Sequence, residues 1–149
     1  MTYGHHLKRT LAISVLFFSG CSSSTRSWTQ ERIDANFPQE CSIMLLEPEN
    51  PFHNLEIELQ KQEERIVVYL NVHGTPITPL PDHTYPVIFD IDDQIFTYHA
   101  HVFEGNQRLL LPQKAQQQLL ESLNREAKIS IRAGKYHTDV TYEGFKPMS

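Results

Sequence analysis

The chain has 149 residues, with 13 Lys and Arg against 18 Asp and Glu, so its formal charge at pH 7 is −5. This length suffices for one domain and is short for two. The acidic balance disfavours nucleic acid as a partner, because affinity for nucleic acid comes mainly from Lys and Arg side chains that neutralise phosphates.

The first twenty residues are organised like an export signal. Lys8 and Arg9 lie in an opening segment without acids, and the apolar run LAISVLFFSG follows over residues 11–20. Ten helical residues rise roughly 15 Å, about half the hydrocarbon core of a bilayer, so the run is too short to span a membrane. A basic head, a short apolar segment and small residues before a break predict a signal peptide over residues 1–20.

The residues around this break resemble the lipobox of bacterial lipoproteins. Ser19, Gly20 and Cys21 match its two small residues and its modified cysteine, while Phe18 stands where leucine is usual. The resemblance implies that Cys21 carries a diacylglyceryl thioether, becomes the new N-terminus and anchors the protein through acyl chains. Because Ser22 rather than Asp follows, it also implies the outer membrane of a Gram-negative cell. The alternatives are cleavage elsewhere, or an uncleaved cytoplasmic chain with a buried cysteine at this position.

Export would leave a more acidic chain with one further cysteine. Removing residues 1–20 takes away two cations and no acid, which leaves 11 Lys and Arg against 18 acids and changes the charge from −5 to −7. With Cys21 acylated, Cys41 has no partner for an internal disulfide. Cys41 begins the apolar run CSIMLL, which indicates a small buried side chain. The alternative is an intermolecular disulfide.

Residues 21–38 are expected to hold the lipidated cysteine, a polar tether and a short helix. The stretch SSSTRS has the composition of a flexible tether. Three apolar residues at near-helical spacing predict the helix, which Pro38 would end: Trp28, Ile33 and Phe37. A single β-rich domain is then expected over residues 39–149.

Alternating apolar residues predict the first strands of this domain. Residues 41–47 form one candidate, and in LEIELQ the apolar Leu55, Ile57 and Leu59 face one way while polar residues face the other. After a turn at KQEER, residues 66–73 are predicted to form a central strand. The stretch GTPITPLPDHTYP, with four prolines, predicts a long surface loop.

The second half of the chain predicts two more hairpins and one helix. TYPVIFDI and QIFTYHAHVF are joined at Asp92 and Asp93, and KISIRA and HTDVTYEGF are joined at Gly134. Residues 109–133 also allow a parallel strand–helix–strand crossover. Its helix is expected to begin near Pro112 and to bury an apolar stripe of Ala115, Leu119, Leu120 and Leu123.

The expected fold class is α+β, mainly β: an antiparallel sandwich or curled sheet of about seven strands, with one late helix packed on it. The segment VFEGNQRLLLPQKAQQQLLESLNREAKISIRAG is similar to part of exported bacterial proteins of the invasion-associated locus B type, in which an LP step precedes a helix and then a strand. That resemblance implies a β-rich exported module and carries no catalytic residue.

Two acids in VIFDIDDQ are the strongest catalytic candidates. This run resembles the first motif of haloacid-dehalogenase-type phosphatases, in which Asp90 would accept the phosphoryl group and Asp92 would be the general acid beside Mg²⁺. The chain departs from that motif at Asp93 and Gln94, where Gly-Thr is usual, and a strand follows instead of a helix. An Asp-rich hairpin turn is therefore favoured.

A pair of histidines is the metal candidate. His99 and His101 in YHAH share one face of a strand, a spacing seen in metal sites, and Asp90, His83 or His137 would supply a third ligand. The simpler interpretation is a pair of solvated surface histidines, since apolar residues occupy the opposite face of the same strand.

The proline-rich loop is the candidate binding element, through its apolar residues Ile77, Leu80 and Tyr85. A plain surface crossover is the alternative. Together these features predict a lipid-anchored envelope protein with a non-catalytic binding or assembly domain. Acyl chains on Cys21 would hold it in the membrane, and an edge strand or this loop would contact another envelope protein.

No cofactor is expected for such a protein. The alternative function is a metal-dependent hydrolase or a metal-binding lipoprotein that uses the Asp90/Asp92 and His99/His101 groups.

Overall fold

The computed structural model describes residues 26–32, 42–50 and 55–147. The expectations for the signal peptide, Cys21 and Cys41 lie outside these residues, as does the second half of the helix expected over residues 28–37.

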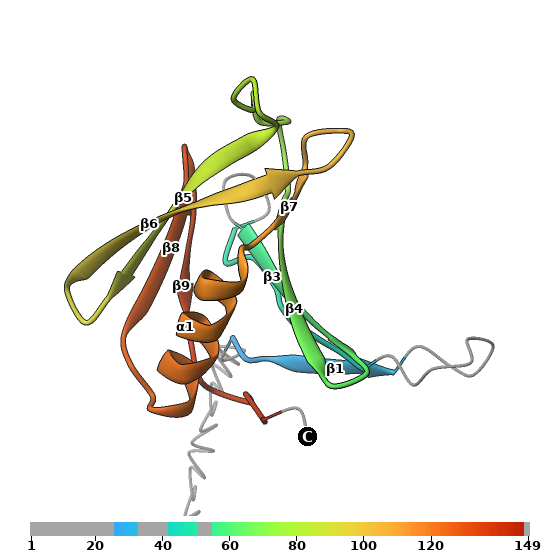
Figure 1. Ribbon diagram of the computed structural model, residues 1–149. Helices are drawn as coiled ribbons and strands as arrows, with labels where there is room; N and C mark the ends of the chain where they lie inside the picture. The colour runs from blue at the N-terminus through green and yellow to red at the C-terminus, as the bar shows by residue number, and fades with distance from the viewer. Residues whose placement is uncertain (1–25, 33–41, 51–54, 148–149) are drawn as a thin grey trace, which may run out of the picture.

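The described chain forms one antiparallel sheet and one helix (Figure 1). The strand order is β1-β2-β3-β4-β7-β6-β5-β8-β9, and every pairing is antiparallel. The elements are β1 (Thr29–Arg32), β2 (Ser42–Leu46), β3 (Leu55–Gln62), β4 (Arg65–Val72), β5 (Thr84–Ile91), β6 (Gln94–Val102), β7 (Arg108–Leu110), α1 (Gln113–Asn124), β8 (Ile129–Ala133) and β9 (Tyr136–Val140).

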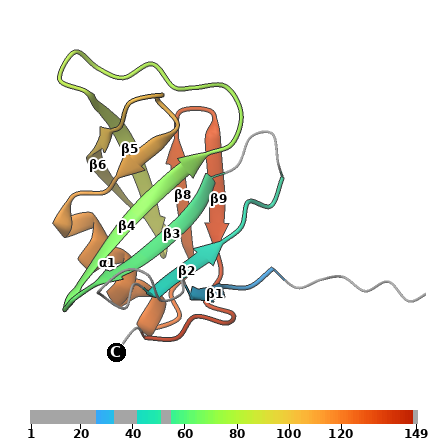
Figure 2. The ribbon, with the colours of Figure 1, turned by 90° about the vertical axis from the view of Figure 1, so that its right-hand side faces the viewer.

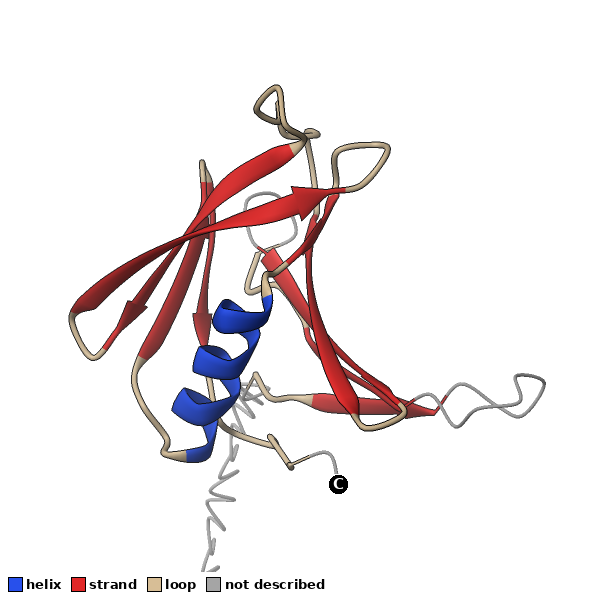
Figure 3. Cartoon of the chain, in the orientation of Figure 1, coloured by secondary structure: helices blue, strands red, loops and turns tan. Residues whose placement is uncertain are grey.

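The sheet is curled, and the helix lies inside the curl. In Figure 1, β5, β6, β8 and β9 form one wall and β3, β4 and β7 the other, with α1 between them. Figure 3 shows the same arrangement by secondary structure. The two walls and the helix share one core, which includes fully buried Ile57, Leu70, Phe89, Leu119 and Ile131. The expected class, α+β and mainly β, is confirmed as a curled sheet of nine strands.

Alternation of apolar and polar residues explains most of the strands. In β3, Leu55, Ile57 and Leu59 are fully buried on the inner face, which is the face turned toward α1. The polar residues of the same strand lie on the outer face. Glu58 departs from this pattern, because its side chain is buried although it belongs to the outer face.

Both expected tight turns are present. Asp92 and Asp93 have φ values of 49° and 66°, and these two positive values are what a two-residue type I′ hairpin loop requires. Aspartate tolerates this conformation better than most residues do. Gly134, with φ of 59°, begins the two-residue loop between β8 and β9.

The N-terminal part of the body differs from the prediction. Thr29–Arg32 form a strand paired with β2 where a helix was expected, so residues before 39, the expected start of the domain, are part of the folded body. Arg26 and Ser27, the last two residues of the SSSTRS stretch, are half-buried and so belong to the folded body. Tertiary pairing overrides a weak helical pattern here.

The helix is confirmed, but the parallel crossover is not formed. α1 follows Pro112 and buries Ala115, Leu119 and Leu123, which belong to the expected stripe. The flanking strands are not neighbours, because β7 lies between β4 and β6 whereas β8 lies between β5 and β9. The last predicted strand also ends early, at Val140, and the chain turns after it.

Candidate functional site

The two histidines of β6 lie on the outer face of the sheet, as the sequence predicts. His99 and His101 are exposed, and their cross-strand neighbours on β5 are Pro86 and Thr84, neither of which is a good metal ligand. The ring of His101 instead meets Phe103 edge-on, with 5.1 Å between ring centroids.

The expected third ligands do not complete a metal site. His83 ends the proline-rich loop, Asp90 lies toward the far end of β5, and His137 is on β9, which β5 and β8 separate from β6. Among the described residues, no three His, Cys, Asp or Glu side chains are grouped closely enough to hold a metal ion.

The acids Asp90 and Asp92 are not brought together as a catalytic pair. Asp90 lies on the outer face of β5, opposite Ser130 of β8. Asp92 lies in the hairpin turn, where its carboxylate accepts hydrogen bonds from Arg125 Nη1 at 2.6 Å and from the Lys128 N–H at 3.0 Å. These bonds, that of Arg125 first, lower the pKa of Asp92. A general acid needs a raised pKa, so this environment opposes the catalytic role.

The proline-rich loop, residues 74–83, is held in place at several points. Ile77 N–H donates to Asn106 O at 2.9 Å, and Gln107 Nε2 donates to Gly74 O at 2.9 Å. The hydroxyl of Tyr136 donates to the carbonyl of Thr75 at 2.5 Å. The loop is thus a fixed feature of the surface rather than a loosely attached crossover.

The structure separates the three apolar candidates of this region. Leu80 is 43% exposed, whereas Ile77 is 7% exposed and belongs to the core. Tyr85 is half-buried and packs against the core. The expectation of an exposed binding side chain therefore holds for Leu80 and is wrong for Ile77, because an apolar residue in a loop over an open core edge turns inward.

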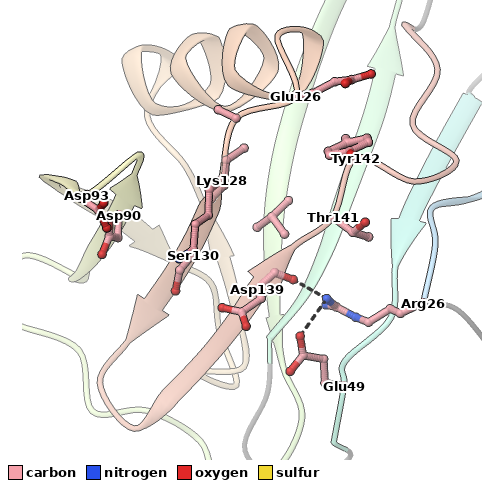
Figure 4. A pocket seen from close by; sticks show the side chains of 13 residues that line it. Arg26, Glu49, Asp90, Asp93, Glu126, Lys128, Ser130, Asp139, Thr141 and Tyr142 are labelled. Carbon is pink, nitrogen blue, oxygen red and sulfur yellow. Dashed lines mark hydrogen bonds and ion pairs between the residues drawn. The ribbon is translucent and has the colours of Figure 1, made fainter.

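A groove of about 560 Å³ lies at the other end of the sheet (Figure 4). It is lined by Asp90 and Asp93, by residues of β8, β9 and the segments before β8 and after β9, and by Arg26 and Glu49 on the opposite wall. In Figure 4, Glu126 and Tyr142 lie at one end of the groove and Asp139 lies close to Arg26. Acids outnumber bases among its lining residues.

Arg26 forms this wall by binding two separate parts of the fold. Its Nε donates to Glu47 O at 2.7 Å and its Nη1 to Glu49 Oε1 at 3.2 Å, both after β2. On the β9 side, its guanidinium donates to Asp139 O and to the hydroxyl of Thr138, which is fully buried. Burial lowers the pKa of Arg26, and the neighbouring carboxylates of Glu49 and Asp139 oppose that shift. The side chain thus joins β9 to the N-terminal edge of the sheet.

Trp28 continues the same connection. Its Nε1 donates to Thr141 O at 2.7 Å, and its backbone N–H donates to Glu143 O at 2.9 Å. Its ring meets that of Phe145 edge-on, with 5.9 Å between ring centroids. Trp28 therefore fixes the segment that follows β9, which includes the C-terminal turn.

The contact between Trp28 and the C-terminal turn depends on a glycine. Gly144 has a φ of +76°, and a Cβ at this position would lie 2.8 Å from Trp28 O. Residues 26–28, which we name the N-terminal strap, therefore hold both the end of β9 and the turn after it.

A second polar cluster lies on the outer face of β3, β4 and β7. The Glu58 carboxylate accepts from Arg108 Nη1 at 2.7 Å, Asn71 Nδ2 at 2.9 Å and Gln60 Nε2 at 2.5 Å. Burial alone would raise the pKa of Glu58, but these donors outweigh it and the pKa is lowered. The Arg108 guanidinium also lies 3.9 Å from the ring centroid of Tyr69. A carboxylate held ionised by three donors is a structural anion rather than a proton carrier.

Sequence reasoning missed the strap and this cluster for different reasons. Arg26 belongs to a polar stretch with tether composition, and nothing in that stretch indicates an arginine bonded into the fold. Glu58 and Arg108 are 50 residues apart, and only the strand order brings them together.

Comparison of the chain with models of known protein families, with curated proteins and with solved structures finds no match. Within the described residues, no helix is both long and apolar enough to cross a membrane.

Proposed function

We propose that the protein is a lipid-anchored component of the bacterial cell envelope whose single domain binds another envelope protein and performs no catalysis. The observation that supports this proposal is the placement of the Ser19-Gly20-Cys21 motif. Its two small residues end the ten-residue run over residues 11–20, and Cys21 lies only five residues before Arg26, which is bonded into the folded body. Such an arrangement suits a small domain attached directly to a membrane by acyl chains.

The geometry of the candidate residues also favours binding over catalysis. Asp92 and Glu58 are both held as anions by arginine, and the cross-strand neighbours of His99 and His101 on β5 are a proline and a threonine. By contrast, Leu80 is an exposed apolar side chain on a firmly attached loop. Covering such a side chain with a partner removes apolar surface from water without first having to order the loop.

Intact-mass analysis of the protein extracted from bacterial membranes tests the anchor. The expected result is a chain that begins at Cys21 and carries the mass of the acyl groups. Cys21→Ser should lose that mass and remain uncleaved, while Cys41→Ser, the matched control, should keep it. Recovery of the full-length, unmodified native chain from the soluble fraction would refute the anchor.

Site-specific photo-crosslinking in intact envelopes tests the partner. A crosslinker at Leu80 should give one discrete adduct, and the same group at Ile95, which is 62% exposed on β6, serves as the control for general surface contact. Equal adducts at both positions, or none at Leu80, would show that this loop does not bind the partner.

A further inference from the structure

We infer that the end of the molecule formed by the N-terminal strap, Tyr142 and the C-terminal turn lies against the surface of the lipid bilayer, with the 74–83 loop directed away from it. This inference rests on the proposed acylation of Cys21. It adds an orientation, which decides the parts of the domain that meet lipid and the parts that meet a protein partner.

The length of the chain between Cys21 and Arg26 limits how far the folded domain can lie from the membrane. Cys21 and Arg26 are five residues apart. Even a fully extended chain spans at most about 3.6 Å per residue, so Arg26 lies within about 18 Å of the acylated cysteine. A cysteine whose acyl chains are buried sits at the boundary of the headgroup layer, and that layer itself takes up about 5–8 Å on each side of the bilayer.

Hydrogen bonds fix the N-terminal strap to the rest of the fold. Its guanidinium is bonded to residues after β2 and to β9, and Trp28 is bonded to Thr141 and Glu143. Detaching the strap to lengthen the connection would break these bonds and expose Trp28, which is 4% exposed in the fold. The strap therefore keeps the tether short, and the surface around it stays close to the bilayer.

The chemistry of this end suits a zwitterionic lipid surface. Tyr142 is 42% exposed beside the groove, and a tyrosine ring with its hydroxyl group is favoured at the headgroup level. Lys128 and Lys146 lie in the same region as Glu126 and Glu143, and acids outnumber bases in the adjoining groove, so this end has no basic patch that would attract anionic lipid. The acyl chains, not attraction to anionic lipid, would hold the domain.

The proline-rich loop lies at the opposite end. Figures 1 and 2 share a vertical axis, and in both the loop between β4 and β5 is at the top, while β1 and the described segment after β9 are at the bottom. The turn between β8 and β9 is also in the upper part of both views, and Tyr136, just after it, bonds to the loop at Thr75. Leu80 would thus face away from the membrane, where a partner can reach it.

Tryptophan fluorescence offers a direct test, because Trp28 is the only tryptophan of the chain. The acylated, membrane-extracted protein is placed in phosphatidylcholine vesicles that contain phosphatidylcholine with a headgroup spin label as quencher. Two matched variants move the single tryptophan to either end: Trp28→Phe with Tyr142→Trp, and Trp28→Phe with Leu80→Trp. We expect quenching of the first to exceed that of the second several-fold. Equal quenching, or stronger quenching at position 80, would overturn the orientation.

Lysine labelling tests the same orientation in the native sequence, without a change at Trp28. A water-soluble amine reagent is applied to the acylated protein in detergent and then on vesicles. Modification of Lys128 and Lys146 should fall several-fold on vesicles, while Lys135, in the β8–β9 turn, should react equally in both. Uniform protection of all three lysines, or none, would contradict the inference.

Intact mass measured on the same samples separates the two proposals. An acylated protein without a difference between the two ends overturns the orientation alone. A protein without acyl groups overturns both the anchor and the orientation.

Discussion

Glu58 is buried on the face of the sheet that otherwise meets water, and its environment explains why it stays ionised. Three neighbouring side chains donate to its carboxylate, and Arg108 among them also lies over the Tyr69 ring. Burial raises the pKa of Glu58 and these donors lower it, and Arg108 contributes both a hydrogen bond and its charge, so the pKa is lowered in the folded protein.

Arg108→Met should therefore destabilise the protein at neutral pH. Fully buried ion pairs cost roughly 3–5 kcal/mol when one partner is removed, and we expect about 2 kcal/mol here because the Arg108 side chain is 36% exposed. In the native protein the lowered pKa of Glu58 stabilises the fold above the ordinary glutamate pKa, about 4.3, and this contribution is lost as the pH falls through the folded value. The difference between native and variant, measured by urea unfolding, should thus be largest at pH 7 and shrink below about pH 4.

Arg132→Met is the matched control, since Arg132 is exposed on the outer face of β8. The loss of unfolding free energy caused by Arg132→Met should stay within about 0.5 kcal/mol and should not depend on pH over the same range. A loss for Arg108→Met that is equal at neutral and acidic pH would show that packing on Tyr69, not the charge of Glu58, is responsible.

Gly144→Ala tests the close contact between the two ends of the chain. The new Cβ would meet both a positive φ and Trp28 O at 2.8 Å, so we expect a loss of roughly 2–3 kcal/mol in the free energy of unfolding. Gly105 has a φ of +91° and no described atom within 4 Å of an added Cβ, so Gly105→Ala reports the backbone strain alone, about 1 kcal/mol. If the two variants lose equal stability in urea unfolding, the contact with Trp28 is not tight in solution.

At the scale of elements, the proline-rich loop combines a core residue and a surface residue only three positions apart. Ile77→Ala should cost about 2–4 kcal/mol of unfolding free energy, because it empties a buried position. Leu80→Ser should change stability by less than about 0.5 kcal/mol and should act on partner binding instead. Thermal melting of both variants, with the Leu80 crosslinking experiment, checks this division. A large loss of stability for Leu80→Ser would place that residue in the core in solution.

The strands and turns with a strong local signal could be predicted, and the elements decided by distant partners could not. The period of two in LEIELQ predicts β3, and the tolerance of aspartate for positive φ predicts the turn at Asp92 and Asp93. β7 has only three residues, and it is a strand because it pairs with β4 on one side and β6 on the other. Trp28 fits a weak helical spacing, but its indole N–H donates a hydrogen bond to Thr141 O, 113 residues away.

The candidate sites also divide into features that the local sequence predicts and features that depend on distant residues. The exposure of His99 and His101 follows from the alternation of β6, so it is confirmed. Whether a third ligand joins them depends on the strand order, and β5 places a proline and a threonine beside them. The connection made by Arg26 between Glu47 and Asp139 depends on the curl of the whole sheet, which a local pattern does not encode.

For the whole molecule, the strap connects the two ends of an open sheet. β1 and β9 are the terminal strands, and residues 26–28 run from the end of β9 into β1. Terminal strands are open to pairing with other chains, and at β9 the guanidinium of Arg26 already binds one backbone carbonyl, that of Asp139. The same three residues thus stabilise the domain and, in our proposal, set its distance from the membrane.

Truncation separates the contribution of the strap from that of the rest of the N-terminal segment. A chain that begins at Arg26 should unfold at nearly the same urea concentration as the Cys21→Ser chain that begins at residue 21. A chain that begins at Thr29 should lose about 3–5 kcal/mol, because it lacks the buried Trp28 ring and the bonds of Arg26 to β9. Hydrogen exchange should then accelerate in β9 and after it, while β3 and β4, at the centre of the other wall, keep their relative protection. Equal stability of the chains that begin at Arg26 and Thr29 would mean that the sheet holds its curl without the strap.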